Sequence, residues 1–174
     1  IGKSHLQNVS DFDIQIEPTK HREGFTAPPE DLNVATRSDL DNDTYQYERQ
    51  AYWDKPDPKV PIPFYGFKEY FAVMRHGFNT GGSHLEWVKK NAPETLALRG
   101  RDKQFDHDFI VPQAIRTKVP EEHYSTTYIA DRAVEWLEAR RSNDKPFLLM
   151  VSFPDPHHPF TPPGKYWDMY KPED

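Results

Sequence analysis

Lysine and histidine side chains stand close together at two places that lie far apart in the sequence. Lys3 and His5 are separated by one residue, and His157 and His158 are neighbours in a proline-rich stretch. Side chains alternate along an extended backbone, so Lys3 and His5 would point to the same side of a strand. An ammonium and an imidazole on one side can hold an anion together, although an ordinary surface strand can carry the same pair. His157 and His158 are also titratable near neutral pH, so these four residues are the candidates for a functional site.

The histidine pair follows a stretch that predicts a buried strand. Residues 147–153 are apolar almost throughout, which is typical of a strand buried on both faces. Five prolines then occur within residues 154–163, and each fixes φ and removes a backbone donor, so this segment is a loop. Open α/β sheets bind ligands at the carboxyl ends of their strands. We therefore expect the loop with His157 and His158 to form half of an active site, and the first residues of the chain to form the other half.

The elements before this strand predict the fold class. Residues 126–141 carry an apolar stripe at helical spacing, with hydroxyl residues at the start and arginines at the end, and predict the clearest helix. A short turn joins this helix to the buried strand, as in the second half of a βαβ crossover. Residues 83–91 predict a shorter helix capped by Ser83, and residues 12–16 predict a brief strand. The expected fold is α/β, with a parallel sheet covered by helices and long proline-rich loops.

The composition fits one modest core that carries many loops. Of 174 residues, 36% are hydrophobic and 17 are proline, while 14% are aromatic, which is more than a disordered chain carries. The net charge of −6 offers no basic surface for nucleic acid. The chain has no cysteine, so it contains no disulfide and no thiolate metal site. No apolar run reaches membrane-spanning length, and none resembles a signal peptide.

The remaining histidines and acidic residues do not predict a metal site. His76 and His84 have no carboxylate or imidazole partner at a characteristic spacing. Asp39, Asp41 and Asp43 alternate like calcium ligands, but the glycine and the closing glutamate of an EF-hand are missing. We therefore expect no metal ligands in this chain.

Two motifs at opposite ends of the chain resemble the sulfatase family. The run Ile-Gly-Lys-Ser-His-Leu at residues 1–6 is similar to the family's second signature, in which a Gly-Lys-x-His-Leu run follows a strand. The run Pro-Phe-Leu-Leu-Met-Val-Ser-Phe-Pro-Asp-Pro-His-His-Pro-Phe at residues 146–160 resembles the family's later strand and its His-x-Pro loop. Residues 128–131 and 162–166 also look like the family. The motifs stand in the family's order, and the middle of the chain is variable loop.

The resemblance implies an alkaline-phosphatase-like α/β fold and the hydrolysis of sulfuric esters. The family's nucleophile is a formylglycine hydrate, made from Cys or Ser in a Cys/Ser-x-Pro-x-Arg motif, beside a divalent cation that is expected to be calcium. That motif does not occur in this chain. The resemblance places it before Ile1, and the metal ligands before Ile1 and beyond Asp174. Residues 1–174 are therefore expected to be an internal portion of a single sulfatase-like catalytic domain, truncated at both ends and inactive alone.

The resemblance also implies roles for individual residues. Lys3 would bind an oxygen of the sulfate or phosphonate and stabilise the charge of the transition state. His5 would contact the formylglycine hydroxyl and act as the base that expels sulfate. His157 would hydrogen-bond the ester and donate a proton to the leaving oxygen, and His158, at the variable position, is a second substrate-binding candidate. Lys3, His5 and His157 are expected to surround one anion-sized space.

Two other functions stay open from the sequence. A phosphonate monoester or phosphodiester hydrolase of the same superfamily would use the same lysine and histidines on a similar tetrahedral anion. A non-catalytic carbohydrate-binding or scaffold domain would instead use Tyr and Trp side chains in loops. The expected substrate is a small-molecule or glycan sulfate ester, with specificity residing in loops 20–63 and 92–124. The family leans toward a periplasmic or secreted location, but a cytoplasmic location and the oligomeric state stay open.

Overall fold

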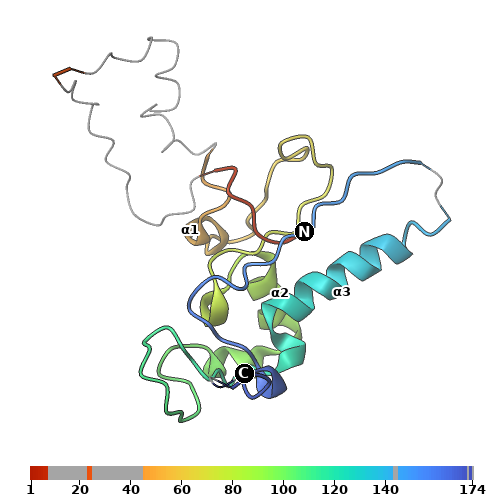
Figure 1. Ribbon diagram of the computed structural model, residues 1–174. Helices are drawn as coiled ribbons and strands as arrows, with labels where there is room; N and C mark the ends of the chain where they lie inside the picture. Colours follow the sequence, from red (N-terminus) through yellow and green to blue (C-terminus); the bar gives the residue numbers. More distant parts are fainter. Residues whose placement is uncertain (8–22, 25–44, 143–144, 172, 174) are drawn as a thin grey trace. The chain divides into compact units, whose positions relative to one another are not determined.

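The computed structural model describes residues 1–7, 23–24, 45–142, 145–171 and 173. The strand predicted for residues 12–16 lies outside this set. The chain divides into two compact units, one formed by Ile1–Ser4 with Lys59–Asp174 and the other by His5–Pro58. Figure 1 traces both units along the sequence.

Short helices joined by long loops make up the described residues. The α-helices are α1 (Gln50–Trp53), α2 (Ser83–Asn91) and α3 (Ser125–Glu138), and the 3-10 helices are η4 (Gly77–Asn79), η5 (Pro93–Leu98), η6 (Glu121–His123) and η7 (Gly164–Tyr166). Helices α2 and α3 confirm the two predicted helices. The prediction that Ser83 caps α2 is wrong, because Gly82 occupies the cap position. The Ser83 hydroxyl instead accepts a hydrogen bond from the Ala72 amide at 3.1 Å.

Three parallel segments form the centre of the first unit. Gly2 makes parallel bridges to Ala72 on one side and to Ser152 on the other. The Gly2 amide donates to the Phe71 carbonyl at 2.8 Å, and the Ser152 amide donates to the Ile1 carbonyl at 2.9 Å. The three segments therefore run in the same direction and meet near the N-terminus (Figure 1). Within the described residues the pairing consists of these isolated bridges, with no longer strand.

The central segment requires glycine at position 2. Gly2 is buried and has a φ of +107°, a conformation that L side chains rarely adopt. A Cβ atom at this position would lie 1.8 Å from the carbonyl oxygen of Ser152. Since no side chain fits in that space, glycine is what lets the segment that contains Ser152 approach.

A small apolar core lies between the central segments and the helices. Val73, Tyr128 and Ile129 form a buried cluster, and Ile1 and Trp87 pack against it. Tyr128 and Ile129 come from α3, whose inward side is therefore anchored on the segment that contains Val73.

The prediction that residues 147–153 form a strand buried on both faces is wrong. Phe147 is 57% exposed and Leu148 is 79% exposed. Among the described residues, this run pairs with the first residues of the chain, and the Trp136 ring of α3 packs edge-on against Phe147, with ring centroids 5.0 Å apart. Apolar side chains favour burial, but a strand is buried on both faces only when other residues pack against each face. The described residues do not pack against both faces of this run.

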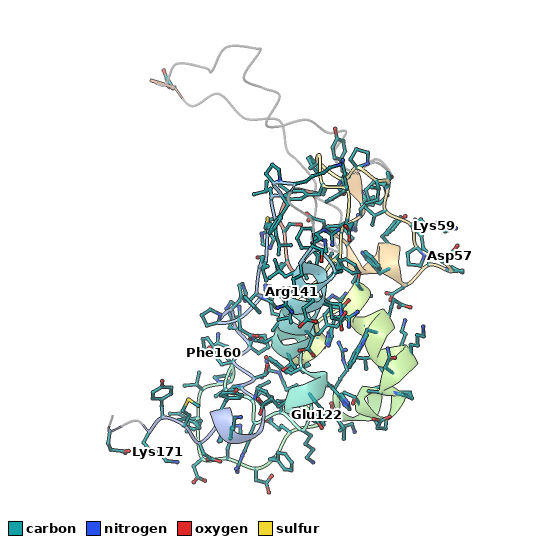
Figure 2. All side chains as sticks on the ribbon, turned by 90° about the vertical axis from the view of Figure 1, so that its right-hand side faces the viewer. Asp57, Lys59, Glu122, Arg141, Phe160 and Lys171 are labelled. Carbon is teal, nitrogen blue, oxygen red and sulfur yellow. The ribbon has the colours of Figure 1, made fainter. Side chains whose placement is uncertain are left out.

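The proline-rich loop that follows this run is bound to residues 113–115 of the same unit. The Phe160 amide donates to the Gln113 carbonyl at 2.8 Å, and the Ile115 amide donates to the Phe160 carbonyl at 3.0 Å. Figure 2 labels Phe160 among the side chains of this region. The loop is therefore held at its far end by backbone hydrogen bonds as well as by the strand-like segment that enters it.

The second unit contains α1 and a buried carboxylate. Glu48 is almost completely buried and accepts a hydrogen bond from the Gln7 amide at 2.6 Å. The Gln7 side chain in turn accepts from the Tyr47 amide at 3.0 Å. These bonds connect the start of the unit to the segment that leads into α1.

Candidate active site

A cluster of one lysine and two histidines lies at the carboxyl ends of the three parallel segments. Lys3 ends the central segment, His76 follows the segment of residues 71–74, and His157 follows the segment of residues 150–153. Parallel strands share one carboxyl edge, where α/β folds bind their ligands. The backbone pairing therefore brings together three side chains that are remote in sequence.

Lys3 and His76 form a direct hydrogen bond. The Lys3 Nζ atom lies 2.8 Å from His76 Nε2 and 3.4 Å from the Arg75 carbonyl oxygen. An ammonium group can only donate, so Nε2 of His76 is the acceptor and carries no proton. The His76 ring is therefore the neutral tautomer with its proton on Nδ1.

His76 also stacks on His157. The two ring centroids are 3.5 Å apart and the ring planes are inclined by only 7°. His157 Nδ1 lies 2.6 Å from the His158 carbonyl oxygen, which can only accept, so Nδ1 is the donor. Nε2 of His157 is thus the ring nitrogen through which this residue can exchange a proton with a ligand.

A buried polar network fixes the loop that carries His157. Asp155 accepts hydrogen bonds from the Tyr124 hydroxyl at 3.1 Å and from the Thr126 hydroxyl at 2.7 Å. Tyr124 also contacts the Thr161 hydroxyl at 2.6 Å. Burial, followed by the charge of Asp155, raises the pKa of Tyr124, so the phenol stays protonated and donates. The loop is therefore clamped to the start of α3 on both sides of its histidines.

Gly77 allows the His76 loop to lie against the proline-rich loop. Its φ is +53°, and a Cβ atom there would lie 2.9 Å from the Thr161 hydroxyl oxygen and 3.0 Å from the Pro159 carbonyl oxygen. A larger residue would push the two loops apart. The ring stack between His76 and His157 depends on this approach.

The predicted site residues have different outcomes. Lys3 and His157 do come close, with His76 between them, and His158 stands beside His157, with ring centroids 4.3 Å apart. His5 is exposed and belongs to the second unit. Sequence reasoning missed His76, whose available signal was its position just after an apolar segment and just before a glycine.

A second histidine cluster is centred on His84, which is buried and has hydrogen-bond partners at both ring nitrogens. His84 of α2 bonds the Thr80 hydroxyl through Nδ1 at 3.0 Å and donates to the His123 carbonyl through Nε2 at 3.1 Å. The His123 ring contacts the Thr95 hydroxyl at 2.7 Å. Burial, with a smaller contribution from the charge of Arg99 and against the His123 hydrogen bond, lowers the pKa of His84 to about 4. This cluster is suited to holding α2 in place rather than to proton transfer.

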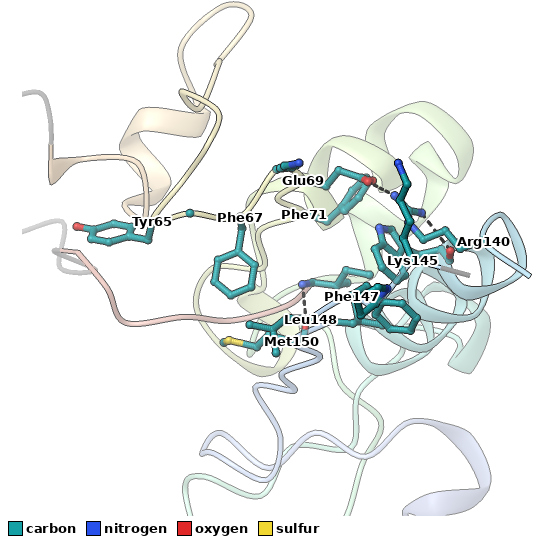
Figure 3. Close-up of a pocket in the computed structure, with 15 residues that line it drawn as sticks. Tyr65, Phe67, Glu69, Phe71, Arg140, Lys145, Phe147, Leu148 and Met150 are labelled. Atoms are coloured by element: carbon teal, nitrogen blue, oxygen red, sulfur yellow. Dashed lines mark hydrogen bonds and ion pairs between the residues drawn. The ribbon is translucent and has the colours of Figure 1, made fainter. Parts of the chain in front are cut away.

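An apolar pocket lies apart from the lysine–histidine cluster. It has a volume of about 550 Å³ and is bounded mainly by apolar side chains, with an ion pair between Glu69 and Arg140 (Figure 3). The labelled lining residues are Tyr65, Phe67, Glu69, Phe71, Arg140, Lys145, Phe147, Leu148 and Met150. Lys3, His76 and His157 are not among the residues that line it. The exposed apolar run thus forms one wall of this pocket.

The described residues do not contain a group suited to a metal ion. No set of three or more His, Asp or Glu side chains in this part of the chain could hold a cation. Within the same residues, no helix has the length and the apolar character needed to cross a membrane.

Several curated proteins are similar to parts of this chain. An arylsulfatase of Clostridium perfringens is 43% identical over 51 residues, 29% of this chain and 10% of that protein. The multifunctional alkaline phosphatase superfamily protein PehA of Trinickia caryophylli is 36% identical over 128 residues, 68% of this chain and 24% of that protein. An ulvan-active sulfatase of Formosa agariphila is 45% identical over 113 residues, 56% of this chain and 22% of that protein. The chain therefore spans about a quarter or less of these relatives, and no solved structure gives a significant match.

A family comparison covers the larger part of the chain. The sequence model described as Sulfatase matches residues 72–174, which include α2, α3, His76 and His157. The match begins after Lys3 and His5. Since it spans more than half of the chain and contains both stacked histidines, the chain belongs to the sulfatase family, whose fold is of the alkaline-phosphatase-like α/β type.

Proposed function

We propose that this chain supplies the substrate-binding and proton-transfer groups of a sulfuric ester hydrolase. Membership of the sulfatase family supports a hydrolase that acts on a sulfate ester. The observation that carries the proposal is the contact of Lys3 with the His76–His157 stack at the carboxyl ends of parallel segments. A cation with imidazoles beside it suits a tetrahedral anion, because charge-assisted hydrogen bonds to such anions are strong.

Lys3 binds an oxygen of the sulfate group in this proposal. Its ammonium is held beside His76 at 2.8 Å, and its positive charge would attract a sulfate oxygen at this place. Negative charge shifts among the sulfate and leaving oxygens as the ester bond breaks. A fixed positive charge at this place stabilises the transition state more than the ground state, which raises kcat.

His157 acts on the leaving oxygen. With Nδ1 donating to the His158 carbonyl, the cationic ring carries a second proton on Nε2. As the bond between sulfur and the ester oxygen breaks, Nε2–H protonates that oxygen, and the organic part leaves as an alcohol. His158 is proposed as a second contact to the substrate.

The nucleophile and the metal are proposed to lie outside this chain. A formylglycine hydrate would supply the nucleophilic oxygen, and a divalent cation, proposed to be calcium, would supply positive charge at the site. His5 is proposed as the base that accepts a proton when sulfate is expelled. The relatives are at least four times longer than their matched stretches, which supports residues 1–174 as an internal portion of one catalytic domain.

The test is sulfate release by the full-length protein that carries this chain. The substrates are an aryl sulfate and a sulfated oligosaccharide, and the variants are Lys3→Ala and His157→Ala. We expect each variant to lower kcat/KM by on the order of a hundredfold or more, because each removes a group that contacts the reacting ester. Lys89→Ala is the matched control, since Lys89 is an exposed lysine of α2 that pairs with Glu86. Equal activity of the wild type and both variants would refute the proposal.

Hydrolysis of a phosphonate monoester or a phosphodiester is the second candidate. PehA, which is similar over 68% of this chain, is described as a multifunctional protein of the alkaline phosphatase superfamily, and this supports testing esters other than sulfates. Lys3 and His157 would serve the same roles on a phosphorus centre. The ratio of kcat/KM for matched aryl sulfate and aryl phosphonate esters separates the two, and a ratio above one selects the sulfatase.

A glycan sulfate is the proposed natural substrate class. The similarity to an ulvan-active sulfatase over 56% of this chain supports it. A preference for the sulfated oligosaccharide over the aryl sulfate is the expected result. Binding of glycan without hydrolysis, unaffected by Lys3→Ala and His157→Ala, would favour a carbohydrate-binding domain instead.

A further inference from the structure

We propose that His76 is a positioning residue that orients Lys3 and His157 together, as a neutral link between a cationic lysine and a proton-donating histidine. This role rests on the proposed sulfatase function. His76 is half-buried, accepts from Lys3 through one ring nitrogen and presents a ring face to His157. It does not have to touch the substrate to affect catalysis.

The hydrogen bond to His76 restricts the Lys3 side chain. A lysine side chain has a flexible four-carbon stem, and it loses conformational entropy when its ammonium is held in one place. The 2.8 Å bond to Nε2, together with the Arg75 carbonyl at 3.4 Å, fixes the ammonium before substrate arrives. Binding energy from the sulfate is then not consumed in ordering the lysine.

The stack restricts the His157 ring in a different way. His157 is exposed, so its ring would otherwise turn about its side-chain bonds. The parallel contact with His76 at 3.5 Å sets the plane of the ring, and the Nδ1 bond to the His158 carbonyl sets its rotation within that plane. These two constraints fix the direction of Nε2, the atom that is proposed to carry the proton to the ester oxygen.

A neutral acceptor has an advantage over a carboxylate at this position. Asp or Glu would also orient Lys3, but its negative charge would cancel the ammonium charge and repel a sulfate. The neutral imidazole orients the lysine without adding a negative charge beside its ammonium. The face of a neutral ring can also lie against an imidazolium at low cost, whereas a second cation could not.

The backbone around His76 is built for this contact. Gly77 leaves no room for a Cβ atom between the His76 loop and the Pro159 carbonyl. Ala72 and Val73, in the segment that leads to His76, are fully buried against their neighbours. The position of the His76 ring is therefore set by a rigid segment and not by a free loop.

Three substitutions separate the two contacts and the charge. His76→Gln keeps an acceptor close to the place of Nε2 and loses the ring, whereas His76→Phe keeps a flat ring and loses the acceptor. His76→Asp provides an acceptor with a negative charge. Asn79→Ala is the control for general disturbance, since Asn79 is an exposed residue of η4 in the same loop.

The measurement is kcat and KM of the full-length protein on an aryl sulfate, with the affinity for inorganic sulfate as a second readout. We expect His76→Phe to raise KM and weaken sulfate binding, and His76→Gln to lower kcat with KM nearly unchanged, each by on the order of tenfold. His76→Asp should weaken sulfate binding most. In a double-mutant cycle, His76→Phe should have little further effect once Lys3 is replaced by Ala.

The outcomes distinguish this role from the proposed function. If the wild type hydrolyses sulfate esters and binds sulfate but His76→Gln and His76→Phe match it, the role of His76 is refuted and the function stands. If all three variants lose activity equally, with KM and sulfate affinity unchanged, His76 has only a structural role and the inference also fails. If the wild type neither hydrolyses sulfate esters nor binds sulfate, both the proposed function and the role of His76 are refuted.

Discussion

Two histidine clusters in this protein use the same side chain for opposite purposes. His84 is 2% exposed, and both of its ring nitrogens have hydrogen-bond partners. His157 is exposed, and among the described residues only its Nδ1 has such a partner. Both ring nitrogens of His84 are engaged in hydrogen bonds that hold α2. Nε2 of His157, by contrast, is left to interact with a ligand. Exposure and the number of satisfied ring nitrogens therefore separate a structural histidine from a candidate catalytic one.

The largest effect should come from Gly2→Ala, which removes the exposed cluster while leaving the buried one in place. Its Cβ atom would lie 1.8 Å from the Ser152 carbonyl oxygen, so the segments of Gly2 and Ser152 must separate. We expect the free energy of unfolding to fall by about 4 kcal/mol or more, with loss of activity, as measured by urea denaturation and sulfate release. Gly164→Ala is the matched control, because Gly164 also has a positive φ but has no atom within 4 Å of a Cβ. A loss for Gly2→Ala no larger than the control's, about 1 to 2 kcal/mol, would contradict the structure.

The second largest effect should come from low pH, which destabilises the fold through the buried His84. The pKa of His84 is lowered from 6.5 to about 4 by burial, so the folded protein binds fewer protons than the unfolded chain between these values. The stabilisation is complete above pH 6.5 and is lost as the pH falls toward 4, about 3 kcal/mol in all for a shift of this size. Urea unfolding at pH 7, 5.5 and 4.5 measures it. The slope with pH should be shallower in His84→Phe, and an unchanged slope would show that His84 is not the titrating group.

The smallest effect should come from Asp155→Asn. Asp155 connects the loop that carries His157 to the start of α3. The substitution keeps the shape but weakens the bonds from Tyr124 and Thr126 by removing the charge. We expect kcat to fall on the order of tenfold because the His157 loop loses its anchor, and unfolding to become easier by about 1 kcal/mol. Glu138→Gln, at the exposed far end of α3, is the control. A change in stability without a change in kcat would show that the anchor does not position His157.

Much of this arrangement could be predicted from the sequence. The apolar stripe of α3 is a local signal, and so are the prolines that make residues 154–163 a loop. The approach of Lys3 and His157 follows from the rule that parallel strands share a carboxyl edge. His76 could not be found in this way, because its partner nitrogen and ring face are set by the register of residues 71–74 against Gly2. No spacing within the sequence encodes that register.

The exposed apolar run at residues 147–153 should lower the solubility of this polypeptide. Phe147 and Leu148 present hydrophobic surface on the wall of an apolar pocket. Surfaces of this kind promote self-association at the concentrations used in purification. A preparation limited to residues 1–174 should therefore be prone to precipitate, and added detergent or a solubilising fusion partner should keep it dispersed.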